Sequence, residues 1–175
     1  IMFNALVNGK TVENYLDTRA HGDLMISLRP QASDWENAWK KNNESHPLVS
    51  DWAFQGVGIG VQDLDATINY YSDIGFEETS EELVDRSFGT RGRSVRVGPL
   101  WFSFFETSGK ESVYSESIET REDGVNDLVF SVASLDREIN KLESKGVELY
   151  RRSDDGKSAF FDTRAEGNIM IRLVQ

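Results

Sequence analysis

Several features that define common protein classes are missing from this sequence. It contains no cysteine, which excludes a disulfide framework and thiolate chemistry. Its longest apolar runs, such as residues 100–105, are far shorter than the roughly 20 residues that a membrane helix needs. No basic segment followed by an apolar one opens the chain, so we expect no signal peptide and no membrane partner, and we assign the protein to the cytoplasm.

Basic residues are scarce relative to acidic ones. The chain has 19 Lys and Arg against 30 Asp and Glu, which gives a net charge of -11 at pH 7. Because neutralising phosphates takes clustered Lys and Arg, this balance disfavours nucleic acid as a partner. The acidic surplus fits simple solubility and also attraction of a cationic ligand, and composition does not separate the two. The 175 residues, 38% of them apolar, are enough to bury the core of one domain.

One segment occurs near both ends of the chain. Residues 15–28 read YLDTRAHGDLMISL, and residues 160–173 read FFDTRAEGNIMIRL. Both copies are typical of a hairpin, with a short strand, a polar turn closed by glycine and an alternating strand. The chain is therefore built from a repeated unit.

Two longer units between these hairpins begin alike. Residues 57–61 predict a strand that runs into a helix with Asp63 as its N-cap, and Leu64, Ile68 and Tyr71 lie on one face of that helix. Gly75 stands at a good C-cap position. Residues 128–132 predict the same kind of strand before a second helix, with its apolar stripe at Leu135, Ile139 and Leu142 and its end at Gly146.

Three strand candidates follow each helix, so each unit is βαβββ. They are residues 82–85, 94–97 and 101–106 in the first unit and 147–151, 159–162 and 169–174 in the second. Residues 112–122 predict a short connecting helix. Because one βαβββ unit leaves a face of its sheet uncovered, two must pair. The predicted fold class is α+β, with two paired βαβββ modules forming a cupped mixed sheet plus an extra N-terminal β-hairpin.

The expected domain organisation has three parts. Residues 1–30 form a partial module, the end of a βαβββ unit whose first strand and helix are missing. Residues 31–52 form a linker with a short helix that packs Trp35 and Trp39 on the body. Residues 53–175 form the paired domain, with modules at 53–108 and 124–175. The sequence leaves open whether the chain is a fragment of a longer tandem protein or a truncated tandem.

The openings of both units resemble a known family. Residues 54–65 (FQGVGIGVQDLD), followed by Tyr70-Tyr71 and Ile74-Gly75-Phe76, resemble the start of a module of the glyoxalase/bleomycin resistance protein/dioxygenase superfamily, also called vicinal oxygen chelate. Residues 124–132 and 167–175 resemble the start and end of a second such module. Residues 97–100, 109–114 and 161–164 are similar to the methylmalonyl-CoA epimerase-like branch of this superfamily.

The resemblance implies where metal-dependent relatives would hold a divalent ion. The four ligand positions fall on Gly56, Ser103, Asp127 and Arg172. Only Asp127 could ligate well, since glycine has no side chain, a hydroxyl is a weak donor and a guanidinium repels a cation. We therefore predict no metal and no cofactor. The only histidines, His21 and His46, are expected in solvated surface loops.

Charge and strand alternation predict what lines the cup instead. An unpaired charge in a half-buried cup is costly, so we expect Asp127 and Arg172 to form an ion pair; alternatively, Arg172 captures an anionic group that Asp127 orients. Whether side chains fill the cup or leave room for a small, flat or partly apolar ligand stays open. The predicted ligand-binding residues are Trp101, Ser103, Phe105, Asp127, Val129, Ser131, Met170 and Arg172.

Three function hypotheses fit these residues. The first is a small-molecule binding protein without catalysis, similar to the bleomycin-resistance branch, which takes a cationic drug at a dimer interface. The second is an isomerase or lyase acting on a thioester or keto compound, although Asp127 is the only inward carboxylate available for acid/base work. The third is a degenerate scaffold kept for assembly. A homodimer is compatible with all three.

Overall fold

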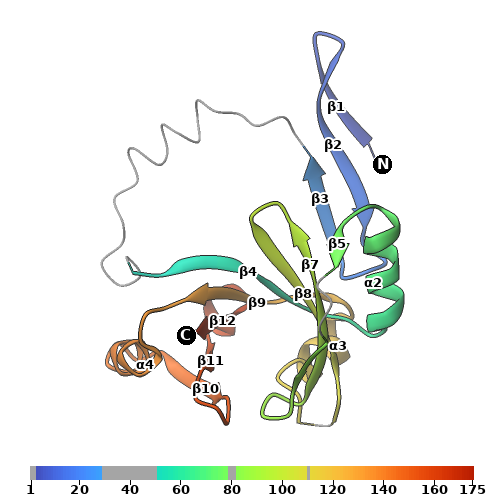
Figure 1. Ribbon diagram of the computed structural model, residues 1–175. Helices are drawn as coiled ribbons and strands as arrows, with labels where there is room; N and C mark the ends of the chain where they lie inside the picture. The colour runs from blue at the N-terminus through green and yellow to red at the C-terminus, as the bar shows by residue number, and fades with distance from the viewer. Residues whose placement is uncertain (1–2, 29–50, 79–81, 110) are drawn as a thin grey trace.

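The computed structural model describes residues 3–28, 51–78, 82–109 and 111–175. They form an α+β fold with a nine-stranded mixed sheet and a separate three-stranded sheet, which confirms the predicted fold class. Figure 1 shows α2 and α4 on opposite sides of the molecule, with the strands of the large sheet between them. In the described part of the chain, no helix is both long and apolar enough to cross a membrane.

The first module occupies one half of the large sheet. Its helix begins where predicted, because the Asp63 side chain accepts a hydrogen bond from the Ala66 backbone N–H at 2.9 Å. The elements of this module are β4 (Ala53–Gly60), α2 (Leu64–Asp73), β5 (Glu77–Glu78), β6 (Leu83–Asp85), β7 (Thr90–Val97) and β8 (Leu100–Thr107). Both β5 and β6 pair with β7.

The second module repeats this order in the other half. The predicted connecting helix is α3 (Ser115–Arg121), and Ser134 caps the module's main helix by accepting from the Arg137 backbone N–H at 3.4 Å. The elements of the module are β9 (Gly124–Ser131), α4 (Leu135–Glu143), β10 (Glu148–Arg152), β11 (Ser158–Asp162), α5 (Arg164–Gly167) and β12 (Met170–Val174).

The two modules meet through their first strands. The sheet order is β10-β11-β12-β9-β4-β8-β7-β5, with β4 and β9 antiparallel at the centre. The last strand of each module lies parallel to the first strand of the same module, β8 beside β4 and β12 beside β9. This arrangement brings the three strands that carry the predicted ligand-binding residues, β8, β9 and β12, together around β4.

The N-terminal segment contains one strand more than the predicted hairpin. Its sheet has the order β1 (Phe3–Val7), β2 (Lys10–Thr18), β3 (Leu24–Leu28), all antiparallel. The turn matches that of the C-terminal hairpin in one contact: Thr18 Oγ1 donates to the Leu24 carbonyl and Thr163 Oγ1 to the Ile169 carbonyl, both at 2.6 Å.

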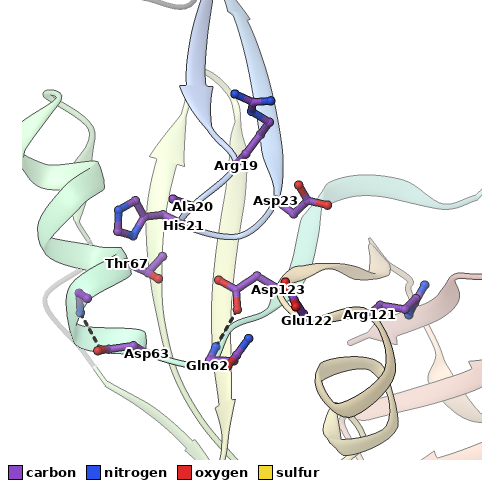
Figure 2. Close-up of a pocket in the computed structure, with 11 residues that line it drawn as sticks. Arg19, Ala20, His21, Asp23, Gln62, Asp63, Thr67, Arg121, Glu122 and Asp123 are labelled. Atoms are coloured by element: carbon purple, nitrogen blue, oxygen red, sulfur yellow. Dashed lines mark hydrogen bonds between the residues drawn. The ribbon is translucent and has the colours of Figure 1, made fainter.

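The N-terminal sheet packs on the first module beside α2. Ile26 is only 7% exposed in a core cluster that also contains residues of β4, α2 and β8. The backbone N–H of Gly22 donates to Asp123, which also accepts from the Gln62 N–H (Figure 2). His21 lies in a turn, as predicted, but it is only partly solvated, because its ring is half-buried and stacks on Tyr70 with 4.2 Å between centroids.

Strand alternation divides the side chains of the large sheet between two faces. The outer face is the one covered by α2 and α4, and apolar residues of both helices pack on it. On β8, Phe104 points to this outer face, so its neighbours Ser103 and Phe105 point to the inner face. The predicted linker helix, with Trp35 and Trp39, and His46 lie outside the described residues.

Candidate functional site

The inner face carries a pocket of about 430 Å³. Strands of both modules contribute to it, and Arg172 is the one ionisable residue among the described residues that line it. This size lies within the range of about 300 to 1,000 Å³ that small-molecule sites occupy. The lining residues are Gln55, Gly56, Leu83, Ser94, Trp101, Ser103, Phe105, Val129, Arg172 and Val174.

The pocket contains five of the eight predicted ligand-binding residues. These are Trp101, Ser103, Phe105, Val129 and Arg172.

The other three residues lie elsewhere. Asp127 and Met170 are fully buried at 0% exposure and do not line the pocket; both lie beside Tyr114 of the connecting segment. Ser131 sits at the end of β9, where its hydroxyl accepts a hydrogen bond from Gln55 Nε2 at 2.8 Å. Alternation assigned all three to the correct strands, but it could not show how deep each side chain lies.

One end of the inner face is filled by the segment that connects the modules. Val113 and Tyr114, just before α3, are 2% and 1% exposed and pack in one cluster with Phe105, Phe160 and Met170. The Tyr114 ring stacks on Phe105 with 5.0 Å between centroids. The alternatives that the sequence left open, a filled cup and an open one, are therefore both present, at different ends of the same face.

Arg172 stands at the boundary between the filled and the open end. Its guanidinium carbon lies 5.8, 5.6 and 5.3 Å from the ring centroids of Phe88, Phe105 and Phe160. Its Nε donates to the Ser158 hydroxyl at 3.1 Å. Arg172 also lines a second cavity of about 310 Å³, which shares Leu83 and Phe105 with the pocket. The aromatic rings fix the position of the guanidinium group through cation–π contacts.

The predicted direct ion pair between Asp127 and Arg172 is wrong. Among the described residues, no ion pair within 4.0 Å joins them. The Tyr114 hydroxyl instead donates to Asp127 Oδ1 at 2.6 Å, and Asp127 Oδ2 has no hydrogen-bond partner among the described residues. The contact from Tyr114 could not be predicted, because strand alternation identifies inward positions only within strands and Tyr114 lies in the connecting segment.

Burial favours the uncharged forms of Tyr114 and Asp127, the two side chains beside Arg172. Burial, and then the neighbouring Asp127, raise the pKa of the Tyr114 hydroxyl well above its ordinary value, so the hydroxyl keeps its proton. Burial also raises the pKa of Asp127, against the opposing effect of the Arg172 charge. Both side chains therefore favour their uncharged forms next to Arg172.

Gly56, the first of the four positions implied for a metal, has no room for a side chain. A Cβ at Gly56 would lie 1.8 Å from the Trp101 carbonyl oxygen of the neighbouring strand. A bulge between Phe54 and Gly56 also turns Gln55 toward the pocket without turning over the strand that follows. Gln55 was not among the predicted ligand-binding residues, because strand alternation assumes a regular strand.

The remaining positions do not suit a cation either. Ser103 Oγ lies 2.8 Å from Ser94 Oγ, so each hydroxyl satisfies the other. Asp127 is bound by Tyr114, and Arg172 brings a positive charge to the place where a metal would lie. No group of three or more His, Asp or Glu side chains within the described ranges could hold a metal ion. These residues do not fit a divalent ion.

A second, polar pocket of about 350 Å³ lies where the N-terminal sheet meets α2 and the turn before β9 (Figure 2). Its lining includes Arg19, Asp23, Asp63, Arg121 and Glu122. Both signs of charge are mixed in this pocket, and Asp123 between them is occupied with two backbone N–H groups. This polar pocket arises where the N-terminal sheet packs on the first module.

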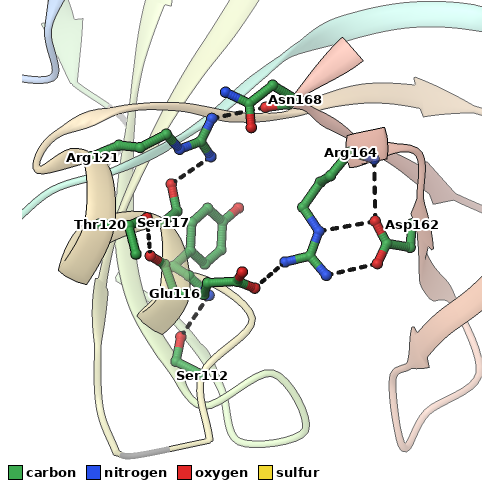
Figure 3. A network of polar contacts seen from close by, with 9 residues as sticks. Ser112, Glu116, Ser117, Thr120, Arg121, Asp162, Arg164 and Asn168 are labelled. Carbon is green, nitrogen blue, oxygen red and sulfur yellow. Dashed lines mark hydrogen bonds and ion pairs between the residues drawn. The ribbon is translucent and has the colours of Figure 1, made fainter. Parts of the chain in front are cut away.

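A polar network closes the other end of the sheet (Figure 3). Arg164 holds Asp162 through two hydrogen bonds of 2.9 and 2.6 Å and also contacts Glu116 of α3. Arg121 donates to the Asn168 carbonyl at 2.8 Å. These contacts fix α3 to the C-terminal hairpin and so hold Tyr114, which precedes α3, in place.

Comparison with solved structures identifies similar folds. The crystal structure of methylmalonyl-CoA epimerase from Mycobacterium tuberculosis matches with 26% identity and a TM-score of 0.63, over 77% of this chain and 93% of that chain. A variant of the Streptomyces coelicolor methylmalonyl-CoA epimerase in complex with 2-nitronate-propionyl-CoA matches with 23% identity and a TM-score of 0.60, over 69% and 94%. A hypothetical protein from Bacillus halodurans matches with 17% identity and a TM-score of 0.60, over 70% and 93%. The last two show likeness of fold alone.

No match is found among curated proteins. At the level of families, residues 53–165, well over half of the chain, match the family model of the Glyoxalase/Bleomycin resistance protein/Dioxygenase superfamily. This range begins with β4 of the first module and ends within α5 of the second. The chain belongs to the Glyoxalase/Bleomycin resistance protein/Dioxygenase superfamily.

Proposed function

We propose that this chain is a small-molecule binding protein that uses the inner-face pocket and does not use the metal-ligand set of its relatives. The observation that carries the proposal is the open pocket of about 430 Å³, with apolar walls from Trp101, Phe105 and Val129 and few polar groups. A largely apolar pocket with a few converging polar groups is the usual form of a small-molecule site.

The charge of the pocket decides between ligand classes. The acidic composition left a cationic ligand open, but Arg172 is the one charged residue on the described pocket wall. A cation in this pocket would meet a like charge at short range. The ligand we propose is therefore a neutral or anionic molecule with a flat, partly apolar body, and not a cationic drug.

Binding can be tested with a neutral aromatic probe, 1-naphthaleneacetamide, followed through quenching of tryptophan fluorescence, because Trp101 lies on the wall and is 36% exposed. Val129→Phe should fill the pocket and weaken binding by at least about tenfold, equivalent to 1.4 kcal/mol. Val12→Phe makes the same change on the exposed side of β2, away from the pocket, and should leave binding unchanged. Equal binding by both variants, or none by the unaltered protein, would contradict the proposal.

Similarity to methylmalonyl-CoA epimerase supports a second candidate, an isomerase acting on a thioester. One solved relative of that name shares 26% identity over 93% of its own chain. Proton abstraction would need a positioned base, and the inward carboxylate, Asp127, is buried behind Tyr114. Incubation with methylmalonyl-CoA in deuterium oxide discriminates the two functions: deuterium uptake into the acyl group would establish catalysis, and we expect none.

The absence of a metal requirement is part of the proposal. It rests on the four implied positions, which offer a glycine with no space, a paired serine, a buried carboxylate and a guanidinium. Elemental analysis of protein purified without chelators should find far less than one equivalent of transition metal per chain. If the protein contained one equivalent of transition metal, and a chelator removed both the metal and the binding of the probe, the protein would require a metal and this part of the proposal would be wrong.

Compartment and assembly are further parts of the proposal. We place the protein in the cytoplasm, a compartment that suits a chain without cysteine. A homodimer is the assembly that the family resemblance suggests, and exposed apolar residues of the N-terminal sheet, among them Leu6 and Val7, offer a surface for it. Light scattering over a concentration series measures the assembly directly.

A further inference from the structure

Arg172 is unusual in being a fixed positive charge inside a strongly acidic protein. The chain has a net charge of -11, yet the described pocket wall carries this single cation and no carboxylate. Surface arginines such as Arg91 and Arg164 are each bound to two or more acids. Arg172 has no carboxylate within 4.0 Å among the described residues. The second cavity that Arg172 lines includes Glu82 and Asp85, but neither of these acids forms an ion pair with it, so its charge is available to a ligand.

The environment of Arg172 fixes its orientation before any ligand arrives. Three phenylalanine rings surround the guanidinium carbon at 5.3 to 5.8 Å, and Nε is engaged by Ser158 at 3.1 Å. The Tyr114 hydroxyl also interacts with the Arg172 side chain, so these contacts hold one side of the guanidinium and leave the rest of it for a ligand. Because the side chain is already ordered, a ligand that binds it loses little additional conformational entropy.

Behind the arginine lies an acid that cannot neutralise it by direct contact. Asp127 is fully buried, and the Tyr114 hydroxyl occupies its Oδ1 at 2.6 Å. Its Oδ2 has no hydrogen-bond partner among the described residues. A buried polar atom without a partner is costly, and here it lies beside the cation rather than in contact with it. Arg172 is therefore a cation whose neighbouring carboxylate, Asp127, is covered by Tyr114, while the arginine itself lines the pocket.

This arrangement selects a carboxylate among anions. A guanidinium presents parallel N–H groups that match the two oxygens of a carboxylate. A phosphate would favour further positive groups or a helix N-terminus, and the described lining contributes neither. The walls next to the cation, Trp101, Phe105 and Val129, suit a flat apolar body. These features define an aromatic or otherwise flat organic acid.

We infer that Arg172 stands in place of the metal of related proteins and binds the carboxylate of a flat organic acid, whose apolar body lies against Trp101 and Val129. This inference rests on the proposed binding function. It assigns Asp127 and Tyr114 to the positioning of Arg172 and not to contact with the ligand.

A matched pair of probes isolates the contribution of charge. 1-Naphthaleneacetate and 1-naphthaleneacetamide share one ring system and differ in the carboxylate. The unaltered protein should bind the acid at least about tenfold more tightly than the amide, because hydrogen bonds to charged groups contribute about 1.5 to 3 kcal/mol. In Arg172→Met the preference should fall to within about threefold, with affinity for the amide unchanged. Arg19→Met removes an equal charge from the exposed N-terminal sheet and should keep the preference.

The outcomes separate the inference from the function on which it rests. If the amide binds in a Val129-dependent manner but the acid binds no better, or if Arg172→Met keeps the preference, the inference fails and the binding function stands. If neither probe binds, both fail. Should Arg172→Met not fold, the Arg172 Nε–H signal in nitrogen-15 NMR of the unaltered protein replaces it. That signal should shift on addition of the acid and not of the amide, and an unmoved signal would overturn the inference.

Discussion

The two modules share one order of elements but differ on the inner face. At the first-strand position, the first module has Gly56, with no space for a side chain, whereas the second has the buried Asp127. At the last-strand position, Ser103 is satisfied by a neighbouring serine, whereas Arg172 faces the pocket. The first module contributes the open wall, and the second contributes the charge.

This difference shows how a fold of two paired modules can lose a symmetric set of ligand positions and keep its arrangement of strands and helices. The central strands β4 and β9 pair through their backbones, and this pairing does not need a metal ligand at position 56 or 127. The connecting segment fills the space on one side only, through Tyr114. Three predictions test this difference between the modules.

The largest effect is expected where the first module is most tightly closed. Gly56→Ala places a methyl group 1.8 Å from the Trp101 carbonyl oxygen, and backbone cannot move as a side chain does, so β4 and β8 must separate locally. Gly56 also has a φ of +156°, which disfavours a side chain. We expect a loss of about 3 kcal/mol or more in the free energy of unfolding, measured by urea denaturation.

Gly109→Ala is the matched control, since nothing lies within 4 Å of a Cβ there and φ is not positive. A loss below about 0.5 kcal/mol is expected for an exposed site of this kind. If Gly56→Ala were equally mild, then position 56 could accept a side chain, and the closure of the first module's ligand position would be disproved.

Much of the fold could be predicted from the sequence because it rests on local signals that repeat. The N-caps Asp63 and Ser134 and the glycines that end both helices, Gly75 and Gly146, mark the same βα unit twice. Strand alternation also named five residues of the pocket wall. These signals are local, and each unit shows them independently.

The depth and closure of the site could not be predicted, for two physical reasons. A bulge leaves no mark on the apolar pattern of a strand, so Gln55 was not predicted to line the pocket. Tyr114 lies in a connection, where no periodicity tells which side chain inserts between the modules. Since Tyr114 occupies Asp127 Oδ1, missing the tyrosine led directly to the wrong ion pair.

The N-terminal copy of the hairpin extends the comparison beyond the two modules. Thr18 and Thr163 donate the same 2.6 Å hydrogen bond across their turns, but Thr18 is fully buried and Thr163 is half-buried. Replacement by valine leaves a carbonyl oxygen without its donor, and water can reach that oxygen only at the less buried turn. We expect Thr18→Val to cost about 2 kcal/mol and Thr163→Val about 1 kcal/mol in urea unfolding. The reverse order would show that the N-terminal sheet is bound less firmly than its burial indicates.

The smallest effect, and the one of opposite sign, is expected at the charged position of the second module. Because burial raises the pKa of Asp127, the folded state binds its proton more tightly than the unfolded state does. Stability from this group is therefore greatest below the ordinary pKa of aspartate and declines as the pH rises through the raised value. Asp127→Asn keeps an oxygen for Tyr114 and removes the buried charge, while Arg172 stays in contact with the open pocket.

The Asp127→Asn protein should accordingly gain on the order of 1 kcal/mol in unfolding free energy at neutral pH, and this gain should shrink as the pH falls through the raised pKa of Asp127. Urea unfolding of the two proteins across this pH range measures the difference. Destabilisation that grows toward neutral pH would mean that the ionised carboxylate and Arg172 stabilise each other across Tyr114. In that case the arginine would be balanced within the protein, and its availability to a ligand carboxylate would have to be judged from the probe pair alone.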